Sequence, residues 1–410
     1  MKLFVLNSGS SSIKYSLFNI SDGISEIVSG QVERIGEQEG TATLLRAAEK
    51  ERVAAPVADH HAALKLVLRQ LGDHGYLKTF SDLAGCAHRV VHGGAKFSEP
   101  TLIDHQVLDA IEALIPLAPL HNPANLEGIR TLIKLSPDTP QIAFFDTAFH
   151  HHMPEVTCRY ALPEVMFTRH NIRRYGFHGL SHHYLRDEAA KLLKKPPEQC
   201  NLITLHLGNG ASATAIRDGK SIDTSMGFTP LEGLVMGTRP GDIDAGILLY
   251  LMEEKGMTAE TLNQMLNHES GLKGICHTND MREILTRKAR GDRQAKLAFE
   301  MFCYRIKKYI GAYTAILGHV DAVVFAGGIG EHSATVRQEV CSGMEHLGLV
   351  LDRTKNRYFT QGAEMIHHKT GRVAIVAAQT NEAMQMARES ARILKPKLSV
   401  SPRLQIEKDK

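Results

Sequence analysis

One local pattern occurs twice in this chain, half its length apart, and that recurrence constrains the fold more than any other feature. The chain opens with MKLFVLNSGSSSIKYSLF, in which an apolar run leads through a polar turn into an alternating run. Residues 201–221, NLITLHLGNGASATAIRDGKS, repeat the same order of apolar run, turn and alternating run. Both stretches predict a strand–turn–strand unit. Two copies indicate two lobes of similar architecture, although two ordinary hairpins that merely look alike remain the alternative.

Length and composition agree with a two-domain soluble protein. At 410 residues the chain is long for a single core. Basic and acidic residues are interspersed and leave a net charge of +3, which gives no reason to expect a nucleic acid partner. The longest apolar runs, such as VAIVAA near residue 375, are too short to span a membrane, and the apolar start is too short for a signal peptide.

The cysteines favour a cytoplasmic location. The sequence contains no C-x-x-C pair, and its cysteines are scattered at Cys86, Cys158, Cys200, Cys276, Cys303 and Cys341. This spacing favours reduced thiols over a disulfide framework or a zinc site. We therefore expect a cytoplasmic protein.

Periodicity predicts several further elements. Residues 60–72 have helical spacing, and 116–129 is a proline-rich loop that leads into a helix. We expect strands near the starts of four other stretches: 85–94, 141–150, 321–340 and 371–390. The last two strands should each lead into a helix, with Ser333 as a candidate cap for the first. The final stretch, 396–410, has the composition of a polar tail.

Three glycine- or serine-rich turns have the composition of phosphate-binding loops. They are NSGSSSIK (7–14), HLGNGAS (206–212) and GGIGEHS (327–333), and each follows an apolar strand. Glycine lets backbone N–H groups approach an anion, and serine hydroxyls add donors. No GxxxxGK[ST] is present, and GGIGEH lacks the full GxGxxG pattern, so neither a P-loop nor a Rossmann site is predicted. Three such turns favour a nucleotide phosphate site over plain turn chemistry.

Charged residues at expected strand ends are candidates for anion and metal binding. Arg89 and Arg239 lie in glycine- and proline-rich segments, where arginine can bind carboxylate or phosphate through two parallel hydrogen bonds. A surface salt bridge is the alternative for both. Asp146 and Glu382 follow apolar strands, which suits Mg²⁺, with helix capping as the alternative.

Histidines are numerous, 22 in all, but they do not form a zinc motif. His178 and His182 have the i, i+4 spacing of two ligands on a helix, yet no HExxH glutamate or nearby cysteine accompanies them. His121 and His178 instead lie in irregular segments, where active-site histidines often occur.

Taken together, these motifs resemble those of the acetate kinase family, which includes other short-chain carboxylate kinases. The resemblance is carried by VLNSGSSSIKYSLF, HRVVHGG, PLAPLHNP, FDTAFH, YGFHGLSH, LGNGAS, MGTRPGDID, FAGGIGE and TNEA, in family order over nearly the whole chain. It implies an α/β fold of the duplicated actin–sugar kinase–Hsp70 (ribonuclease H-like) type, with two lobes and a central cleft. We expect residues 1–148 and 383–410 in the first lobe and 149–382 in the second, nucleotide-binding lobe.

The resemblance also implies roles for individual residues. The metal, Mg²⁺ or Mn²⁺, would be organised by Asn7 and Glu382. The ATP or ADP phosphates would be contacted by Ser10, Ser12, Lys14, His206, Gly208, Asn209 and Gly210. The adenosine side would be formed by Asp280, Met281, Arg282, Gly328, Ile329, Gly330, Glu331 and His332. Catalysis would involve Arg89, Arg239, His178, His121 and Asp146. The acid's methyl group would contact Val91, Leu120, Phe177 and Pro230.

The implied reaction is reversible phosphoryl transfer from ATP to acetate, giving acetyl phosphate and ADP, in a cytoplasmic homodimer. A carboxylate is already ionised near neutral pH, so it can attack phosphorus without a base. We therefore expect Asp146 to orient Arg239 or Mg²⁺ through solvent rather than to act as a general base. The alternatives are the same chemistry on propionate or butyrate, with Val91 favouring acetate, and a non-catalytic nucleotide-dependent clamp on the same fold.

A few positions depart from the family pattern. Lys273, Cys276 and His277 stand where relatives usually carry small or apolar residues, and His332 stands where asparagine is usual. These departures concern the implied adenosine side and therefore nucleotide preference. Ala245 replaces a frequent proline, for which we expect little consequence.

Overall fold

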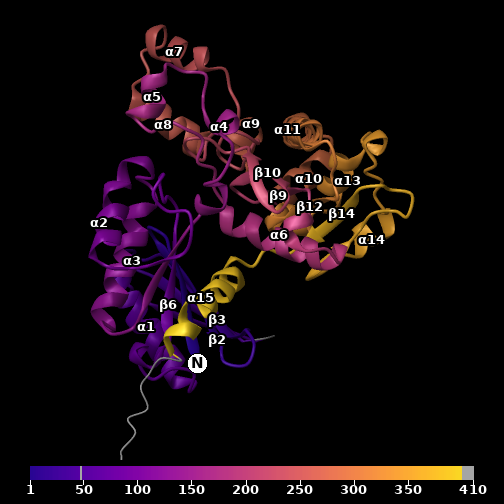
Figure 1. Ribbon diagram of the computed structural model, residues 1–410. Helices are drawn as coiled ribbons and strands as arrows, with labels where there is room; N and C mark the ends of the chain where they lie inside the picture. The colour runs from indigo at the N-terminus through magenta and orange to yellow at the C-terminus, as the bar shows by residue number, and fades with distance from the viewer. Residues whose placement is uncertain (47–48, 399–410) are drawn as a thin grey trace, which may run out of the picture. The chain divides into compact units, whose positions relative to one another are not determined.

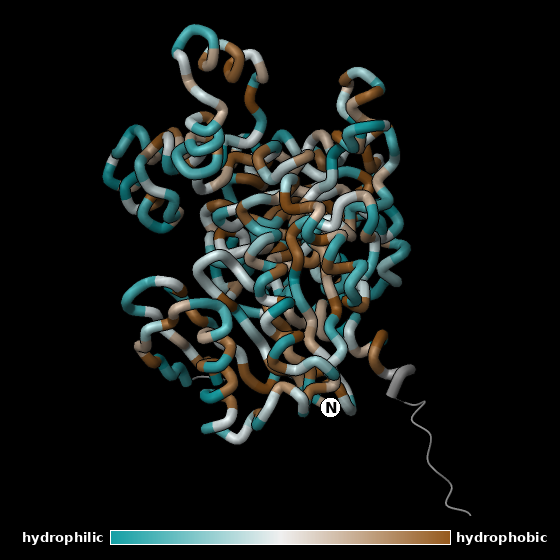
Figure 2. The backbone as a smooth tube through the Cα atoms, turned by 90° about the vertical axis from the view of Figure 1, so that its left-hand side faces the viewer, coloured by the Kyte–Doolittle hydropathy of each residue, from teal (hydrophilic) through white to brown (hydrophobic). Residues whose placement is uncertain are grey.

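The computed structural model describes residues 1–46 and 49–398 and divides into two compact units (Figure 1). Unit 1 comprises Met1–Ala148 together with the helix that begins at Glu382, and unit 2 comprises Phe149–Asn381. Glu382, assigned from the sequence to the second lobe, is thus the first residue of a unit 1 helix. Each unit has its own mixed sheet, with the apolar stretches of the chain running through it (Figure 2).

Unit 1 contains an eight-stranded sheet of order β5-β4-β3-β2-β1-β6-β8-β7. Its strands are β1 (Lys2–Ser8), β2 (Ser12–Asn19), β3 (Ser25–Glu33), β4 (Gly40–Arg46), β5 (Glu49–Ala55), β6 (Gly85–Val90), β7 (Thr101–Leu102) and β8 (Gln141–Phe145). β1 pairs antiparallel with β2 and parallel with β6, which pairs parallel with β8. The opening polar segment is therefore a hairpin turn between β1 and β2, as predicted.

Unit 2 contains a six-stranded sheet of order β11-β10-β9-β12-β14-β13. Its strands are β9 (Leu202–Leu207), β10 (Ala211–Arg217), β11 (Lys220–Thr224), β12 (Ala322–Ala326), β13 (Ala363–Met365) and β14 (Ala374–Ala378). β9 pairs antiparallel with β10 and parallel with β12, which pairs parallel with β14.

The two sheets have the same core topology. The order β3-β2-β1-β6-β8 in unit 1 matches β11-β10-β9-β12-β14 in unit 2, with the same parallel and antiparallel pairings. Even the edge strands correspond, since β7 pairs antiparallel with β8 and β13 pairs antiparallel with β14. The duplication predicted from the two hairpins is confirmed, and the alternative of unrelated hairpins is wrong.

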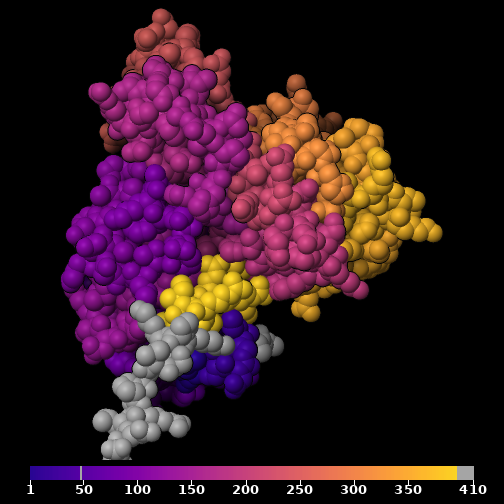
Figure 3. All heavy atoms as spheres, in the orientation of Figure 1, coloured from indigo at the N-terminus to yellow at the C-terminus, as the bar shows by residue number. Residues whose placement is uncertain are grey.

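Helices cover both faces of the unit 1 sheet. They are α1 (His60–Asp73), α2 (His105–Ala113), α3 (Asn122–Leu135) and α15 (Glu382–Leu398), with 3₁₀ turns at Phe80–Asp82 and Ile115–Leu117, and a further 3₁₀ turn, Ala148–His150, begins at the last residue of this stretch of unit 1. Phe4 and Leu6 of β1 share a core with α1. The opposite face packs on α15, where a Cβ on Gly85 would lie 2.9 Å from Leu394 Cδ1. Figure 3 shows this helix, from the end of the chain, against the N-terminal residues.

Unit 2 is richer in helices. They are α4 (Glu155–Cys158), α5 (Glu164–Thr168), α6 (Gly179–Leu193), α7 (Ala245–Glu253), α8 (Ala259–Gln264), α9 (Gly271–Cys276), α10 (Met281–Ala289), α11 (Arg293–Leu317), α12 (Gly327–His332), α13 (Ala334–Cys341) and α14 (Arg353–Tyr358), with a π turn at Met265–Glu269 and 3₁₀ turns at Pro197–Gln199 and Glu345–Leu347. α6 shares a core with β9, β12 and β14, and α11 packs beside β10 and β9.

Two details differ from the sequence prediction. The glycines of GGIGEH were expected to precede a helix, but they form the short helix α12, and Ser333 caps the following helix α13 by accepting a hydrogen bond from Val336 N. Helix α15 continues to Leu398, so the predicted polar tail begins within a helix, and residues 399–410 lie outside the described part of the chain. Among the described residues, no helix combines the length and apolar character needed to cross a membrane.

Candidate active site

Strand register brings three charged side chains together in unit 1. Arg89 lies at the end of β6, Asp146 directly follows β8, and Glu382 begins α15. Side chains alternate along a strand, and parallel neighbours in register share a face. In this register Arg89 pairs with Phe144, two residues before Asp146, and the same face carries Gly85 against α15. Arg89 and Asp146 therefore point to the face from which Glu382 approaches.

Arg89 and Asp146 form a bidentate ion pair. Arg89 Nε donates to Asp146 Oδ1 at 2.9 Å, and Nη2 donates to Oδ2 at 2.7 Å. Glu382 Oε2 lies 3.5 Å from Arg89 Nε. Two parallel bonds fix the plane of the guanidinium as well as its position. The sequence prediction named Arg239 as the arginine that Asp146 orients, whereas its direct partner in the structure is Arg89.

Burial sets the ionisation of this pair. Asp146 is 1% exposed, and burial raises the pKa of its carboxyl group, an increase that Arg89 opposes. Burial also acts to lower the pKa of Arg89, but the carboxylates of Asp146 and Glu382 more than offset this effect and raise it overall. Arg89 is therefore a cation whose charge is largely balanced by the two neighbouring carboxylates.

The first polar turn adds oxygen donors on the same sheet face. Asn7 pairs with Lys14 across the hairpin, and Asn7 follows Leu3 and Val5 at alternate positions of β1. Ser10 and Lys14 are exposed, and Ser12 is half-buried. Asn7 and Glu382 carry a carboxamide and a carboxylate oxygen, which are ligands of the kind that a hard divalent cation takes, whereas both carboxylate oxygens of Asp146 are already engaged by Arg89.

The segment after Arg89 is fixed by two asparagines that the sequence motifs had not singled out. In α3, Asn122 accepts from His92 N at 3.1 Å and donates to His92 O at 3.1 Å, while Asn125 accepts from Val91 N at 3.1 Å. Both asparagines are buried. They explain the PLHNP motif structurally, because the helix locks the HRVVHGG backbone. The only hint in the sequence was their place in a proline-marked helix start.

The remaining unit 1 candidates differ in exposure. Val91 is buried, Leu120 is 48% exposed, and His121 is exposed as the N-cap residue of α3. Of these three residues, Val91 is the buried apolar side chain, which suits it best to contact the methyl group of an acid.

In unit 2 a glycine separates a histidine from an arginine. A Cβ on Gly210 would lie 2.6 Å from Arg239 Nη2 and 3.3 Å from His178 Nε2. Only glycine leaves both side chains in place there, which explains on steric grounds why the second glycine of LGNGAS is a glycine. His178 has a left-handed backbone conformation, with φ of 56°, just before α6, and its ring stacks on His206 with centroids 4.2 Å apart.

Arg239 contrasts with Arg89. Its Nη1 donates to Pro230 O at 2.7 Å, but no carboxylate of the described residues forms an ion pair with it. Burial lowers the pKa of Arg239 to about 10. Arg239 is half-buried, and a partly desolvated guanidinium without a counter-charge is costly, so an anionic ligand would compensate it. Arg239 is therefore the stronger anion-binding candidate of the two arginines.

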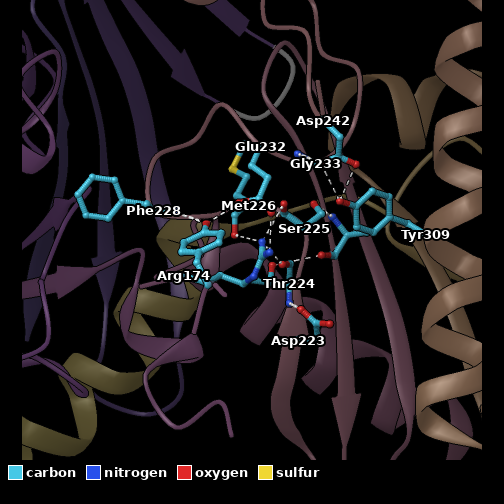
Figure 4. A network of polar contacts seen from close by, with 12 residues as sticks. Arg174, Asp223, Thr224, Ser225, Met226, Phe228, Glu232, Gly233, Asp242 and Tyr309 are labelled. Atoms are coloured by element: carbon cyan, nitrogen blue, oxygen red, sulfur yellow. Dashed lines mark hydrogen bonds and ion pairs between the residues drawn. The ribbon is translucent and has the colours of Figure 1, made fainter. Parts of the chain in front are cut away.

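A polar network holds the segment that carries Pro230 and Arg239 (Figure 4). Arg174 donates to the carbonyl oxygens of Thr224, Ser225 and Met226 and pairs with Glu232. Further along, Asp242 accepts from Gly233 N at 2.8 Å.

Two residues of α11 complete this network. Tyr309 donates to the Asp242 carboxylate, and Arg305 donates to Gly233 O at 2.9 Å. Hydrogen bonds therefore hold the chain on both sides of Arg239.

The third glycine segment approaches the second one closely. Gly327, with φ of 74°, has Leu207 backbone atoms within 2.8 Å of where a Cβ would lie. The buried Arg337 donates to Gly330 O at 2.8 Å and Glu331 O at 2.7 Å, and so holds the end of α12. His332 lies 3.3 Å from the Glu331 carboxylate, and its side chain is largely exposed.

The other adenosine-side candidates begin α10. Asp280 caps this helix and pairs with the exposed Arg282, whereas Met281 is buried. Of the departures from the family pattern, Cys276 is in the core and His277, with φ of 63°, ends α9.

The remaining departures have simple structural settings. Lys273 is exposed. Ala245 is the first residue of α7, a position where proline and alanine are both acceptable.

The histidine clusters do not form a metal site. Among the described residues, no group of three His, Cys, Asp or Glu side chains has the arrangement of a metal centre. The i, i+4 pair instead bonds to hydroxyl groups: His182 is fully buried between Thr204 and Ser212, and His178 bonds to Ser212 through Nδ1.

Comparison with known proteins identifies the family. Residues 2–388 match the model of the acetokinase family. The chain is 51% identical to the acetate kinase of Sulfurovum sp. over 95% of this chain and 98% of the relative, and 52% identical to that of Streptomyces coelicolor over 95% and 96%.

Solved structures agree. Acetate kinase from Porphyromonas gingivalis superposes with a TM-score of 0.89 at 41% identity, covering 96% of this chain and 99% of that one. A propionate kinase from Francisella tularensis has the same TM-score and identity over 95% and 98%. This chain belongs to the acetokinase family.

Proposed function

We propose that this chain catalyses reversible transfer of the γ-phosphoryl group of ATP to acetate, giving acetyl phosphate and ADP. The observation that carries the proposal is Arg239, a half-buried guanidinium beside His178 that pairs with no carboxylate of the described residues, in a chain that matches the acetokinase family over nearly its whole length. Such a cation suits the carboxylate or the transferring phosphoryl group.

Arg239, His178 and Arg89 would each stabilise the transferred phosphoryl group in a different way. Phosphoryl transfer passes through a loose transition state with negative charge on the equatorial oxygens, so catalysis is mostly positioning and charge stabilisation. Arg239 supplies positive charge, and His178 supplies a hydrogen bond. Arg89, held by Asp146, supplies a second cation in a fixed plane.

Asp146 acts as a positioning residue in this account. The acid substrate is ionised near neutral pH, so no proton has to be removed from the attacking oxygen. Both carboxylate oxygens of Asp146 are engaged by Arg89. Its role is therefore to orient Arg89.

Asn7 and Glu382 would hold a divalent cation, Mg²⁺ or Mn²⁺. A cation bound there would supply positive charge to offset that of the transferred phosphoryl group. Around it, Ser10, Ser12, Lys14, His206, Gly208 and Asn209 would contact the phosphates. Asp280, Arg282 and the segment Gly328–His332 would form the adenosine side, with the buried Met281 supporting it.

Acetate is favoured over longer acids by Val91, which is buried and fixed through its backbone by Asn125. Leu120, Phe177 and Pro230 would complete the methyl pocket, with His121 nearby. The similarity to a propionate kinase makes propionate the second candidate, since one methylene gives only about 1–3 kcal/mol of discrimination.

The proposal extends to assembly and location. Helix α7 contains no buried residue, and its Ile247, Leu249, Tyr250 and Met252 are exposed. An apolar surface of this kind fits a homodimer interface, and Leu249→Glu should then lower the mass measured by light scattering.

All six cysteines are buried free thiols, which fits the cytoplasm.

The test is an acid panel. Purified protein with MgATP is offered acetate, propionate or butyrate, and hydroxylamine traps any acyl phosphate as its hydroxamate. We expect the highest kcat/KM with acetate. A higher kcat/KM with propionate would make propionate the preferred substrate instead. If no acid gave a hydroxamate, the proposal would be overturned.

A further inference from the structure

Four side chains in unit 2 form a continuous line of hydrogen-bonding groups that ends at His178. Thr204 Oγ1 lies 2.7 Å from His182 Nδ1, His182 Nε2 lies 2.8 Å from Ser212 Oγ, and Ser212 Oγ lies 2.9 Å from His178 Nδ1. Thr204, His182 and Ser212 are fully buried. Each of their polar protons therefore needs an acceptor within the protein rather than in bulk water.

The fold explains why these residues meet. Thr204 and His206 are alternate residues of β9 and share a face, and Ser212 of β10 pairs with His206 in register. The same face packs on α6. His178 precedes that helix and His182 lies one turn further on, so both rings reach Ser212.

The hydrogen bonds between Thr204 and His178 can run in either of two directions. The Ser212 hydroxyl has one proton, so it donates to one ring and accepts from the other. Burial, followed by the nearby His150 and His206, lowers the pKa of His182 well below its ordinary value, so its ring is neutral and carries a single proton. The line therefore runs either from Thr204 towards His178 or in reverse.

Thr204 distinguishes the two directions. If the line runs towards His178, Thr204 donates to His182 Nδ1, His182 Nε2–H donates to Ser212, and Ser212 donates to His178 Nδ1. Every proton then has an acceptor. In reverse, His182 Nδ1–H donates to Thr204, whose own hydroxyl proton has no second acceptor among the described residues. A buried unsatisfied donor is disfavoured.

We infer that Thr204, His182 and Ser212 are positioning residues that hold His178 in the tautomer protonated on Nε2. That nitrogen lies on the side of Gly210 and Arg239. The inference rests on the proposed function for what Nε2–H binds. Phosphoryl oxygens only accept hydrogen bonds, so the nitrogen facing them must carry the proton.

The test reads the tautomer directly. The full-length protein is labelled with ¹⁵N-histidine, and long-range ¹H–¹⁵N correlation spectra are recorded at about pH 8.5, above the ordinary histidine pKa. His178→Asn assigns the His178 signals by their disappearance. We expect Nε2 of His178 to be protonated and Nδ1 bare. A proton on Nδ1 would overturn the inference.

Two substitutions at Thr204 test the direction of the line. Thr204→Val removes the hydroxyl donor, and His178 should become a mixture of tautomers. Thr204→Ser keeps the hydroxyl and should restore the single tautomer. Thr214→Val is the matched control, since Thr214 is a buried β10 residue bonded to Thr224 rather than to a histidine. It should leave the His178 signals unchanged.

Kinetics connect the tautomer to the reaction. Only the molecules with His178 protonated on Nε2 should be active, so kcat of Thr204→Val should fall in proportion to their share. For an even mixture of the two tautomers, kcat should fall about twofold, with KM values unchanged. A lower kcat without a change of tautomer would overturn the inference. Failure of the proposed function is distinguishable, because it would appear as a wild type with the expected tautomer and no acyl phosphate.

Discussion

Arg89 donates two parallel hydrogen bonds to Asp146, through Nε at 2.9 Å and Nη2 at 2.7 Å. Both residues lie on one face at the carboxyl end of parallel strands, and Asp146 is almost completely buried. This pairing is the basis for the proposal that Asp146 orients Arg89, whereas Arg239 pairs with no carboxylate among the residues that the structure describes.

Asp146→Asn tests this assignment. An amide offers one acceptor and one donor face, so Arg89 would lose its fixed plane, and a misplaced catalytic group costs on the order of 10² in rate. We expect that loss in kcat/KM for acetate, with an unchanged pH profile.

The control is Glu112→Gln, which alters the exposed Arg130–Glu112 pair of unit 1 and should leave the rate unchanged. An acidic limb in the wild-type pH profile that disappears in Asp146→Asn, with unchanged Mg²⁺ dependence, would instead identify Asp146 as a general base.

Arg239→Met should separate stability from activity. Removing a half-buried cation that lacks a carboxylate partner among the described residues should raise the free energy of unfolding by about 1 kcal/mol. It should also lower kcat by on the order of 10²–10³, since a charge-stabilising donor is lost. Urea denaturation and the hydroxamate assay measure the two effects.

Arg337→Met is the contrasting variant. Arg337 is more deeply buried than Arg239, and it is bonded to Asn356 and to two carbonyl groups, so its loss should destabilise the protein. If Arg239→Met were destabilised to the same degree, Arg239 would have a structural role instead.

Gly210→Ala should impair catalysis while leaving the protein folded. The new methyl group would lie 2.6 Å from Arg239 Nη2 and 3.3 Å from the His178 ring, and both side-chain ends can move away. We expect kcat to fall by on the order of 10² through misplacement, with a melting temperature close to that of the wild type.

Gly311→Ala is the matched control, because nothing lies within 4 Å of a Cβ at that helical position. It should stabilise the protein by roughly 0.5–1 kcal/mol and retain activity. Full activity in Gly210→Ala would show that its close contacts do not matter for the reaction.

Stability should fall in mild acid because of buried histidines. Burial lowers the pKa of both His88 and His150 to about 4, against about 6.5 in the unfolded chain. Between these values the unfolded state binds more protons, so the free energy of unfolding should decrease as pH falls from about 6.5 to 4, by up to about 1.4 kcal/mol per pH unit for each group.

Denaturation by urea at several pH values measures this slope. His150→Gln should make it shallower, since one of the contributing groups is gone. An unchanged slope in the variant would mean that His150 does not contribute.

Val91→Ala tests the acid pocket. A smaller side chain should admit an extra methylene, so the ratio of kcat/KM for propionate to that for acetate should rise, within the roughly 10–200-fold range that one methylene provides. A variant with no gain in relative propionate activity would remove Val91 from the pocket.

The parts of the fold predicted from sequence are those with local signals. The hairpin turns after β1 and β9 could be read from composition and alternation, and their recurrence predicted the duplicated sheets. By contrast, the 25-residue helix α11 was not predicted, and the glycines of α12 were expected to precede a helix rather than form one. Glycine disfavours helix by itself, so tertiary packing against Leu207 overrides the local preference.

The candidate site was predictable in its residues but not in its pairings. Arg89 and Asp146 were both identified, yet their contact depends on the register between β6 and β8. Asn122 and Asn125 gave almost no signal, because their hydrogen bonds go to backbone groups distant in sequence. Thr204 likewise gave no signal, because a threonine in a strand is common and its bond to His182 joins residues that are distant in sequence.

The central claim is that this chain transfers phosphoryl groups to a carboxylate rather than acting as a nucleotide-dependent clamp. The most direct measurement is the ratio of ADP released to acetyl hydroxamate trapped when the protein turns over MgATP with saturating acetate and hydroxylamine. The account predicts one hydroxamate for each ADP, and loss of both products when acetate is omitted. ADP release that is independent of acetate and yields no hydroxamate would contradict it.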